Sequence, residues 1–175
     1  MSSRGTSTVV DTARLRLRKL SADDAAFIHE LVNDPAWLCY IGDKHVHTHA
    51  DARRYIEDGP AASYARNGFG LYCVELADAQ VPIGICGLIR REALADVDLG
   101  FAFLERHRGR GYAREAAAAV LEHARRDLRF ARVIAITLPH NRASIRVLES
   151  SGFAFERRLT LPGESAELCA YAREL

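Results

Sequence analysis

The chain has 175 residues, enough for one domain with a substantial core, and its 49% hydrophobic and 27% charged content is ordinary for a globular protein. With 24 Lys and Arg against 23 Asp and Glu, the net charge of +1 argues against a nucleic-acid partner. The four cysteines are scattered and no apolar run reaches the length of a membrane span, so we expect a cytoplasmic protein without disulfides or membrane contact.

The first part of the chain is predicted to be mostly helical. Residues 1–10 are expected to form a flexible N-terminus, ahead of a single domain over residues 11–175. Alternation of leucine and arginine in residues 15–18 predicts a first strand, and residues 37–48 are expected to be irregular. Capping and periodicity signals predict a first helix that starts at residues 21–24 and stops at Pro35. A second helix is predicted to start after Thr48 and to break at Gly59-Pro60, and a short helical piece is predicted over residues 61–66.

From residue 69 onward the pattern alternates strands with two long helices. Helices are predicted over residues 113–128 and 141–150, where apolar residues recur at helical spacing. Short apolar runs predict strands over residues 69–76, 82–90, 99–104, 132–137, 153–161 and 167–172. The order β-α-α-β-β-β-α-β-α-β-β is that of a mixed α/β sheet in one domain.

The stretch from Asp98 to Glu115 joins a strand, a glycine-rich turn and the start of a helix. Gly109 and Gly111 allow the backbone to approach a ligand closely, and the first N–H groups of the helix point outward with the positive end of its dipole. Four arginines add positive charge there: Arg106, Arg108, Arg110 and Arg114. The sequence therefore predicts a site for a phosphate-bearing ligand.

Two common phosphate motifs do not account for this turn. The chain has no P-loop sequence, and Arg114 stands where a dinucleotide fingerprint has its third glycine. The run Arg108-Gly-Arg-Gly-Tyr-Ala113 instead resembles the pyrophosphate loop of the GCN5-related N-acetyltransferases (GNAT), Gln/Arg-x-x-Gly-x-Gly/Ala. Asn141-Arg-Ala-Ser144, followed by Gly152-Phe153, is similar to the second landmark of that family. The two motifs stand in the expected order, so we identify the chain as a member of the family.

The resemblance implies a single-domain fold and a cofactor. The fold is α/β, a mixed and mostly antiparallel sheet with a splayed parallel strand pair, flanked by about four helices. Acetyl-CoA would lie in the gap between the splayed strands as the co-substrate. The side chain of Asn141 would bind its pantetheine arm; the alternative, an N-cap of its own helix, is compatible with that role. The matching backbone positions would be Phe101, Phe103 and Leu104 for the pantetheine and acetyl groups, and Arg108, Gly109, Arg110, Gly111, Tyr112 and Ala113 for the pyrophosphate.

Details of the motifs resemble the branch of ribosomal-protein N-terminal acetyltransferases, since Asp98-Leu-Gly-Phe is similar to its Glu-Ile-Gly-Tyr strand. The resemblance implies transfer of acetyl to a primary amine, on a peptide N-terminus or a small molecule, by direct attack in a ternary complex. The protein would act as a monomer or a homodimer. The alternative is a non-catalytic acyl-CoA-binding or sensor protein with the same fold.

Acetyl transfer to an amine requires a neutral amine, a polarised thioester and a stabilised thiolate. The tyrosine that many members use as the acid is replaced by Leu148, so the resemblance points to Ser144 as the group near sulfur. Glu75 and Asp98 lie on predicted strands near the expected gap and are the candidates for the base. For both, a solvated surface position is the alternative, and the sequence does not assign the base.

His45, His47 and His49 alternate in the irregular segment and would face one way in an extended chain. The segment has no fourth ligand at compact spacing, so we expect no metal. The region of residues 37–67, together with the hairpin at Pro162-Gly163, is expected to form the acceptor side. Its aromatic and acidic residues would suit a cationic amine or plain packing equally well.

Overall fold

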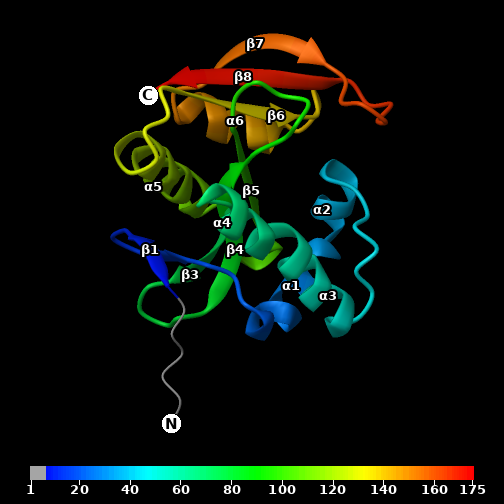
Figure 1. The fold of residues 1–175 in the computed structure, drawn as a ribbon, viewed down its shortest axis with the longest axis vertical. Helices are drawn as coiled ribbons and strands as arrows, with labels where there is room; N and C mark the ends of the chain where they lie inside the picture. Colours follow the sequence, from blue (N-terminus) through cyan, green and yellow to red (C-terminus); the bar gives the residue numbers. More distant parts are fainter. Residues whose placement is uncertain (1–6) are drawn as a thin grey trace.

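In the computed structural model, which describes residues 7–175, the chain folds into one eight-stranded sheet with helices on both faces (Figure 1). The strand order is β1-β2-β3-β4-β5-β6-β8-β7, and the β5–β6 pair is parallel while its neighbours are antiparallel. The strands are β1 Thr8–Asp11, β2 Leu15–Arg18, β3 Leu71–Leu76, β4 Pro82–Ile89, β5 Asp98–Phe103, β6 Arg132–Thr137, β7 Ala154–Leu159 and β8 Leu168–Glu174. The predicted fold class is confirmed.

The helices precede β3 or follow β5 and β6 (Figure 1). Within the described chain, no helix combines the length and the apolar character needed to cross a membrane. Short helical turns lie at η1 Ala22–Asp24, η2 Glu57–Ala61 and η3 Glu105–His107. The α-helices are α1 Ala25–Val32, α2 Pro35–Tyr40, α3 His49–Ile56, α4 Ala62–Asn67, α5 Tyr112–Arg126 and α6 Arg142–Ser150.

Three predictions about the first part of the chain need correction. The flexible start does not include residues 8–10, which form β1 on the edge of the sheet, and residues 1–6 lie outside the described range. α1 ends at Val32, ahead of Pro35, and Pro35 begins α2, because proline at the first helical position lacks only an N–H that is free anyway. Residues 37–40 are therefore helical. The helical segment is not broken at Gly59-Pro60, because the π-helical turn η2 joins α3 to α4.

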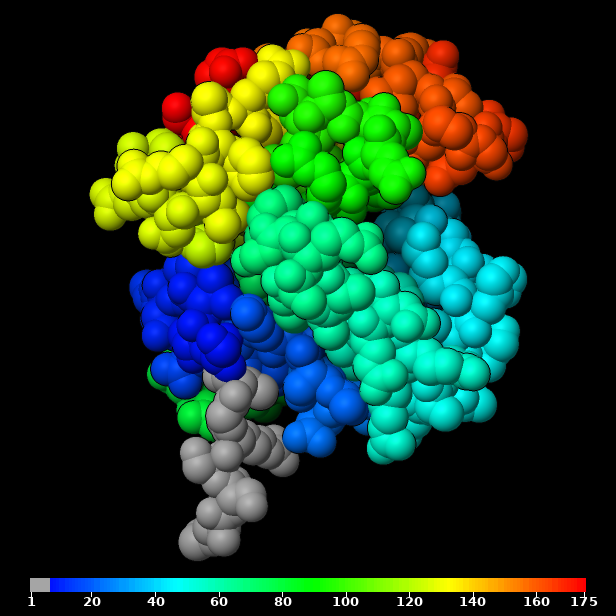
Figure 2. All heavy atoms as spheres, in the orientation of Figure 1, coloured from blue at the N-terminus to red at the C-terminus, as the bar shows by residue number. Residues whose placement is uncertain are grey.

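The core has layers on both faces of the sheet. Alternate side chains of β3, Tyr72 and Val74, join a cluster with α5 and with Leu148 of α6. Cys73 points to the opposite face, where it packs against residues of α1, α2 and α3. A third cluster lies under β6 and β8, around Ile134. In the space-filling view, the first helices (blue to teal) and the β7–β8 segment (orange to red) occupy different ends of the molecule (Figure 2).

Candidate active site

The strands β5 and β6 separate soon after they meet. They pair in parallel only at Asp98 and Ile134, where the Ile134 N–H donates to the Val97 carbonyl at 3.0 Å. Because backbone groups alternate along a strand, the N–H of Phe101 and of Phe103 points toward β6, beyond the last pairing. The structure thus contains the splayed parallel pair, with unpaired donors of β5 along one wall of the gap.

Leu104 differs from the other two predicted backbone positions. Its N–H donates to the Ile83 carbonyl at 2.9 Å, on the β4 side, and its carbonyl accepts from the His107 N–H at 2.9 Å. The Phe103 carbonyl also has a partner, because Arg108 Nε donates to it at 2.8 Å. The free donors in the gap are therefore those of Phe101 and Phe103.

The glycine-rich turn has the predicted geometry. Gly109 and Gly111 adopt φ angles of +72° and +81°, the left-handed region that L side chains rarely occupy. No atom lies within 4 Å of the position of a Cβ on Gly109, so the turn has open space beside it. The first α5 bond is made by the Glu115 N–H to the Gly111 carbonyl. In the described chain, the N–H groups from Gly109 to Arg114 have no hydrogen-bond partner. They form the anion cradle expected at a helix start.

The arginines of the turn divide into two pairs. Arg106 forms an exposed ion pair with Glu30 of α1, and the Nη2 atom of Arg108 lies 2.6 Å from Asp34 Oδ1, at the N-cap of α2. Arg110 and Arg114 form no ion pair with any described residue. The side chain of Arg108 is thus directed at α2, and its N–H donates to the Glu105 carbonyl at 3.1 Å, so Arg108 adds no free donor to the cradle.

Sequence reasoning missed the role of Arg14, between β1 and β2. Its Nη1 atom donates to the Arg110 carbonyl at 2.9 Å, and its Nε atom lies 2.6 Å from Glu115 of α5. The guanidinium also lies 4.6 Å from the centre of the Tyr112 ring. Arg14 therefore supports the turn from the side of the N-terminal strands, and its distance along the chain gave no sequence signal.

At the start of α6, Asn141 caps the helix through its side chain. Its Oδ1 accepts from the Ser144 N–H at 3.2 Å, while its amide nitrogen has no recorded partner. Asn141 therefore caps its own helix, and the cap leaves Nδ2 available for a ligand. The half-buried Ser144 hydroxyl makes no recorded hydrogen bond in the described chain. Leu148 is 1% exposed within the core, so its position supplies no acid.

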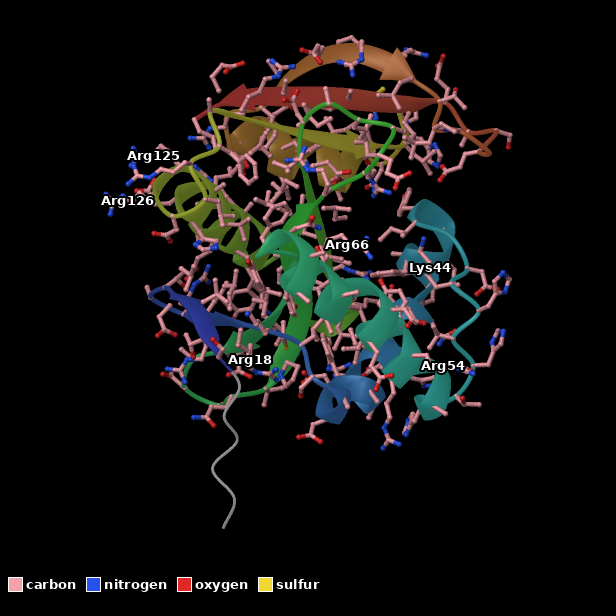
Figure 3. All side chains as sticks on the ribbon, viewed as in Figure 1. Arg18, Lys44, Arg54, Arg66, Arg125 and Arg126 are labelled. Carbon is pink, nitrogen blue, oxygen red and sulfur yellow. The ribbon has the colours of Figure 1, made fainter. Side chains whose placement is uncertain are left out.

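Glu75 is held away from the gap in a buried ion-pair triad. It lies on β3, separated from β5 by β4, and Arg18 Nε contacts its carboxylate at 2.9 Å. The same guanidinium contacts Asp24 at 2.8 Å, and this hydrogen bond raises the pKa of Arg18. Figure 3 places Arg18 at the end of the molecule away from β6 and β8. Glu75 has a structural partner and does not face the β5–β6 gap.

Asp98 lies where β5 and β6 are still paired, at the closed end of the gap. It is 2% exposed and forms an ion pair with Arg91. Burial raises the pKa of the Asp98 carboxyl, and the Arg91 guanidinium opposes that rise. The two base candidates are therefore not brought together with Ser144.

A different pair stands at the open end of the strand gap. His140, which directly precedes Asn141 after β6, lies with its ring centre 5.6 Å from that of Tyr40 on α2. The contact joins the start of α6 to α2. Imidazole is the side chain best suited to exchange a proton near neutral pH. The only sequence signal for His140 was its place beside the asparagine of the second motif.

Comparison with known proteins agrees with this geometry. A family model described as "Acetyltransferase (GNAT) domain" matches residues 14–154, most of the chain. The chain belongs to the GNAT acetyltransferase family. The uncharacterized protein YkkB of Bacillus subtilis is 31% identical over 157 residues, covering 87% of this chain and 88% of YkkB. The uncharacterized N-acetyltransferase YnaD of the same species is 26% identical over 147 residues, 84% of this chain and 83% of YnaD.

Solved structures agree with the family assignment. A GNAT-family acetyltransferase from Bacillus anthracis superposes with a TM-score of 0.80 at 25% identity, covering 94% of this chain and 97% of that one. RimL, a ribosomal L7/L12 α-N-protein acetyltransferase solved with coenzyme A, gives a TM-score of 0.82 at 19% identity, covering 97% and 98% of the two chains. The latter likeness concerns the fold. As a GNAT member, the protein is an acetyl-CoA-dependent acetyltransferase.

Proposed function

We propose that the protein transfers the acetyl group of acetyl-CoA to a primary amine, on a peptide N-terminus or a small molecule, by direct attack in a ternary complex. The observation that carries the proposal is the β5–β6 gap, with unpaired donors along β5 and the glycine turn at its open end. A linear thioester arm joined to a pyrophosphate matches a row of donors that ends in an anion cradle.

The cofactor contacts follow from the donors that remain free. The N–H groups of Phe101 and Phe103 would bind the pantetheine and acetyl groups, and Asn141 Nδ2 would add a side-chain donor. The N–H groups of Gly109, Arg110, Gly111, Tyr112 and Ala113 would bind the pyrophosphate. Leu104 would not bind the cofactor, because its N–H donates to the Ile83 carbonyl. Arg108 would not bind the pyrophosphate, because its N–H donates to Glu105 and its guanidinium pairs with Asp34.

Direct attack is favoured by the state of the two thiols on the central strands β3 and β4. Burial raises the pKa of Cys73 and of Cys86, so neither is a ready nucleophile for an acetyl-enzyme. In the proposed step the amine nitrogen forms the C–N bond, the C–S bond breaks, and the sulfur receives a proton. We assign Ser144 to hydrogen bonding at the sulfur, and His140 to accepting the proton of the amine, in place of Glu75 and Asp98.

The proposal also covers the acceptor and the oligomeric state. A primary amine is proposed as the partner, and both a monomer and a homodimer are compatible with the exposed edge strand β7. The four cysteines are free, which supports the reducing cytoplasm as the compartment.

Calorimetric titration with acetyl-CoA, with NAD and ATP as controls, tests the cofactor assignment. We expect binding of acetyl-CoA alone, with Kd in the range of about 1–100 μM. Release of free thiol is then measured with two panels, short peptides with free N-termini and small primary amines. Turnover with one panel would identify the acceptor class. Binding of acetyl-CoA without turnover on either panel would favour the sensor alternative, and no binding by folded protein would contradict the proposal.

A further inference from the structure

The connection between α2 and α3, residues 41–48, is anchored by one buried residue. Val46 is 3% exposed, and its carbonyl accepts from Asn33 Nδ2 at 2.8 Å. Its neighbours His45 and His47 are both exposed. Val46 therefore faces the core, while the imidazoles on either side of it face the solvent.

The backbone turns Asp43 back onto this pair. His45 adopts a φ angle of +55°, a left-handed conformation that is uncommon for a residue with a side chain. The Asp43 carboxylate accepts from the His45 N–H at 2.7 Å, and its other oxygen lies 3.4 Å from His45 Nδ1. The rings of His45 and His47 have their centres 6.3 Å apart.

The ligand atoms offered by Asp43, His45 and His47 all lie within 4.8 Å of one another. We propose that these three side chains form a binding site for a divalent transition-metal ion such as Zn²⁺. Two imidazole nitrogens and one carboxylate oxygen are a donor set for borderline metals, whereas Mg²⁺ and Ca²⁺ favour oxygen ligands. Three protein ligands on an exposed loop leave further coordination positions to water.

This site differs from the histidine cluster considered from the sequence, for which no metal was expected. His49 does not belong to it, because it lies in the first turn of α3 and its ring packs edge-on against His29, with centres 5.3 Å apart. Asp43 takes its place. His45 is itself left-handed and both its N–H and its Nδ1 lie beside the Asp43 carboxylate, which the alternating histidine pattern did not reveal.

The surroundings of the site are mixed in charge. Lys44 lies on the same connection (Figure 3), and Asp51 of α3 accepts from the His47 N–H at 3.1 Å while it pairs with Arg54. A bound ion would hold Asp43, His45 and His47 together and so fix the connection between α2 and α3. This role is independent of acetyl transfer.

The test is calorimetric titration of the full chain, free of any affinity tag, with Zn²⁺, Ni²⁺ and Mg²⁺ separately. We expect one equivalent of Zn²⁺ and of Ni²⁺, no binding of Mg²⁺, and a higher Tm in the presence of Zn²⁺. The variants are Asp43→Asn, which keeps an oxygen acceptor for the His45 N–H, His45→Asn, which tolerates the left-handed backbone, and His47→Ala. His49→Ala is the matched control, an adjacent exposed histidine outside the site.

Each site variant is expected to weaken Zn²⁺ binding by about tenfold or more, as loss of one of three ligands should, and His49→Ala to leave it unchanged. The Tm of each metal-free variant verifies that it is folded. Absence of Zn²⁺ binding to the wild type would overturn the site. So would binding that survives all three substitutions, or binding that depends on His49.

Discussion

The proposed cofactor side of the molecule, made of β5, the turn at residues 104–111 and the starts of α5 and α6, differs in construction from the proposed acceptor side, the helical segment α1 to α4 that contains residues 37–67. On the cofactor side the free donors are mainly backbone N–H groups, released by left-handed glycines and by strand separation. On the acceptor side the exposed chemistry belongs to side chains on short helices and their connections.

Two ion pairs connect these sides. Arg108 reaches Asp34, which is 9% exposed at the N-cap of α2, and Arg106 reaches the exposed Glu30 of α1. The comparison teaches that a backbone-built site is fixed by local conformation, whereas its alignment with an acceptor depends on a few long side-chain contacts. Variants that affect one side alone can test this division.

Gly111→Val should have the largest effect, confined to the cofactor side. Valine is strained at a φ of +81°, and its side chain would meet Arg14, which lies 3.3 Å from the Cβ position. We expect acetyl-CoA affinity to fall by at least about a hundredfold, or about 2.7 kcal/mol, measured by calorimetry.

Gly163→Val is the matched control, because Gly163 has a φ of +79° with no atom within 4 Å, in the β7–β8 connection. It should carry a similar backbone strain without loss of affinity. Equal loss in both variants would mean that strain, and not the cradle, governs cofactor binding.

His140→Gln tests the point where the two sides meet. If the imidazole accepts the amine proton, kcat should fall by about a hundredfold while acetyl-CoA affinity is retained, and kcat should lose an ionisation in its pH profile. His49→Gln serves as the control on an exposed histidine of α3. An unchanged pH profile in His140→Gln would remove His140 from the proton transfer.

Glu75→Gln separates structure from catalysis. Because Glu75 is 6% exposed and bonded to Arg18, the neutral amide should lower the free energy of unfolding by about 1–3 kcal/mol, measured by urea denaturation. The kcat per folded molecule should stay the same. A loss of kcat larger than the loss of folded protein would restore Glu75 as a base candidate.

The same division explains what the sequence could predict. Glycine spacing and apolar runs specify local conformation, so the turn at Gly109 and Gly111, the strand β6 and the cap at Asn141 were predictable within a residue or two. The fold followed from their order. The segment after Pro35 is mispredicted because a proline that follows one helix also suits the first position of the next.

Contacts between distant side chains had no such local signal. Arg108 and Asp34 are 74 positions apart, and only the folded chain shows that the arginine turns from the phosphate side to α2. The Arg18 triad is similar, since alternation placed Glu75 on a strand but not its partners across the sheet. Ionisable residues of the site were therefore the least predictable part.

Asp34→Asn should weaken the alignment of the two sides without damaging either. Burial alone would raise the pKa of Asp34, but the hydrogen bonds from Arg108 and from the Ala36 N–H outweigh it and lower the pKa, so the carboxylate is charged and bonded at neutral pH. Asparagine preserves the N-cap and loses the charge. We expect KM for the amine to rise about threefold, with acetyl-CoA affinity unchanged in calorimetry, as for loss of one charge-assisted contact. A fall in cofactor affinity instead would assign Arg108 to the cofactor side.

Glu30→Gln should give the smallest effect, because the Arg106 pair is exposed and screened by solvent. The hydrogen bond from Arg106 lowers the pKa of Glu30 below its ordinary value of 4.5. A carboxyl with a depressed pKa in the folded state contributes stability above its ordinary pKa and loses it as the pH falls through the folded value. The wild type should therefore exceed Glu30→Gln by at most about 0.5 kcal/mol in urea denaturation at pH 7, less at high salt and less again below about pH 4. A difference that does not change with salt or pH would show that Glu30 acts through packing on α1. A rise in KM for the amine as large as that of Asp34→Asn would show that both connections, and not the buried one alone, align the two sides.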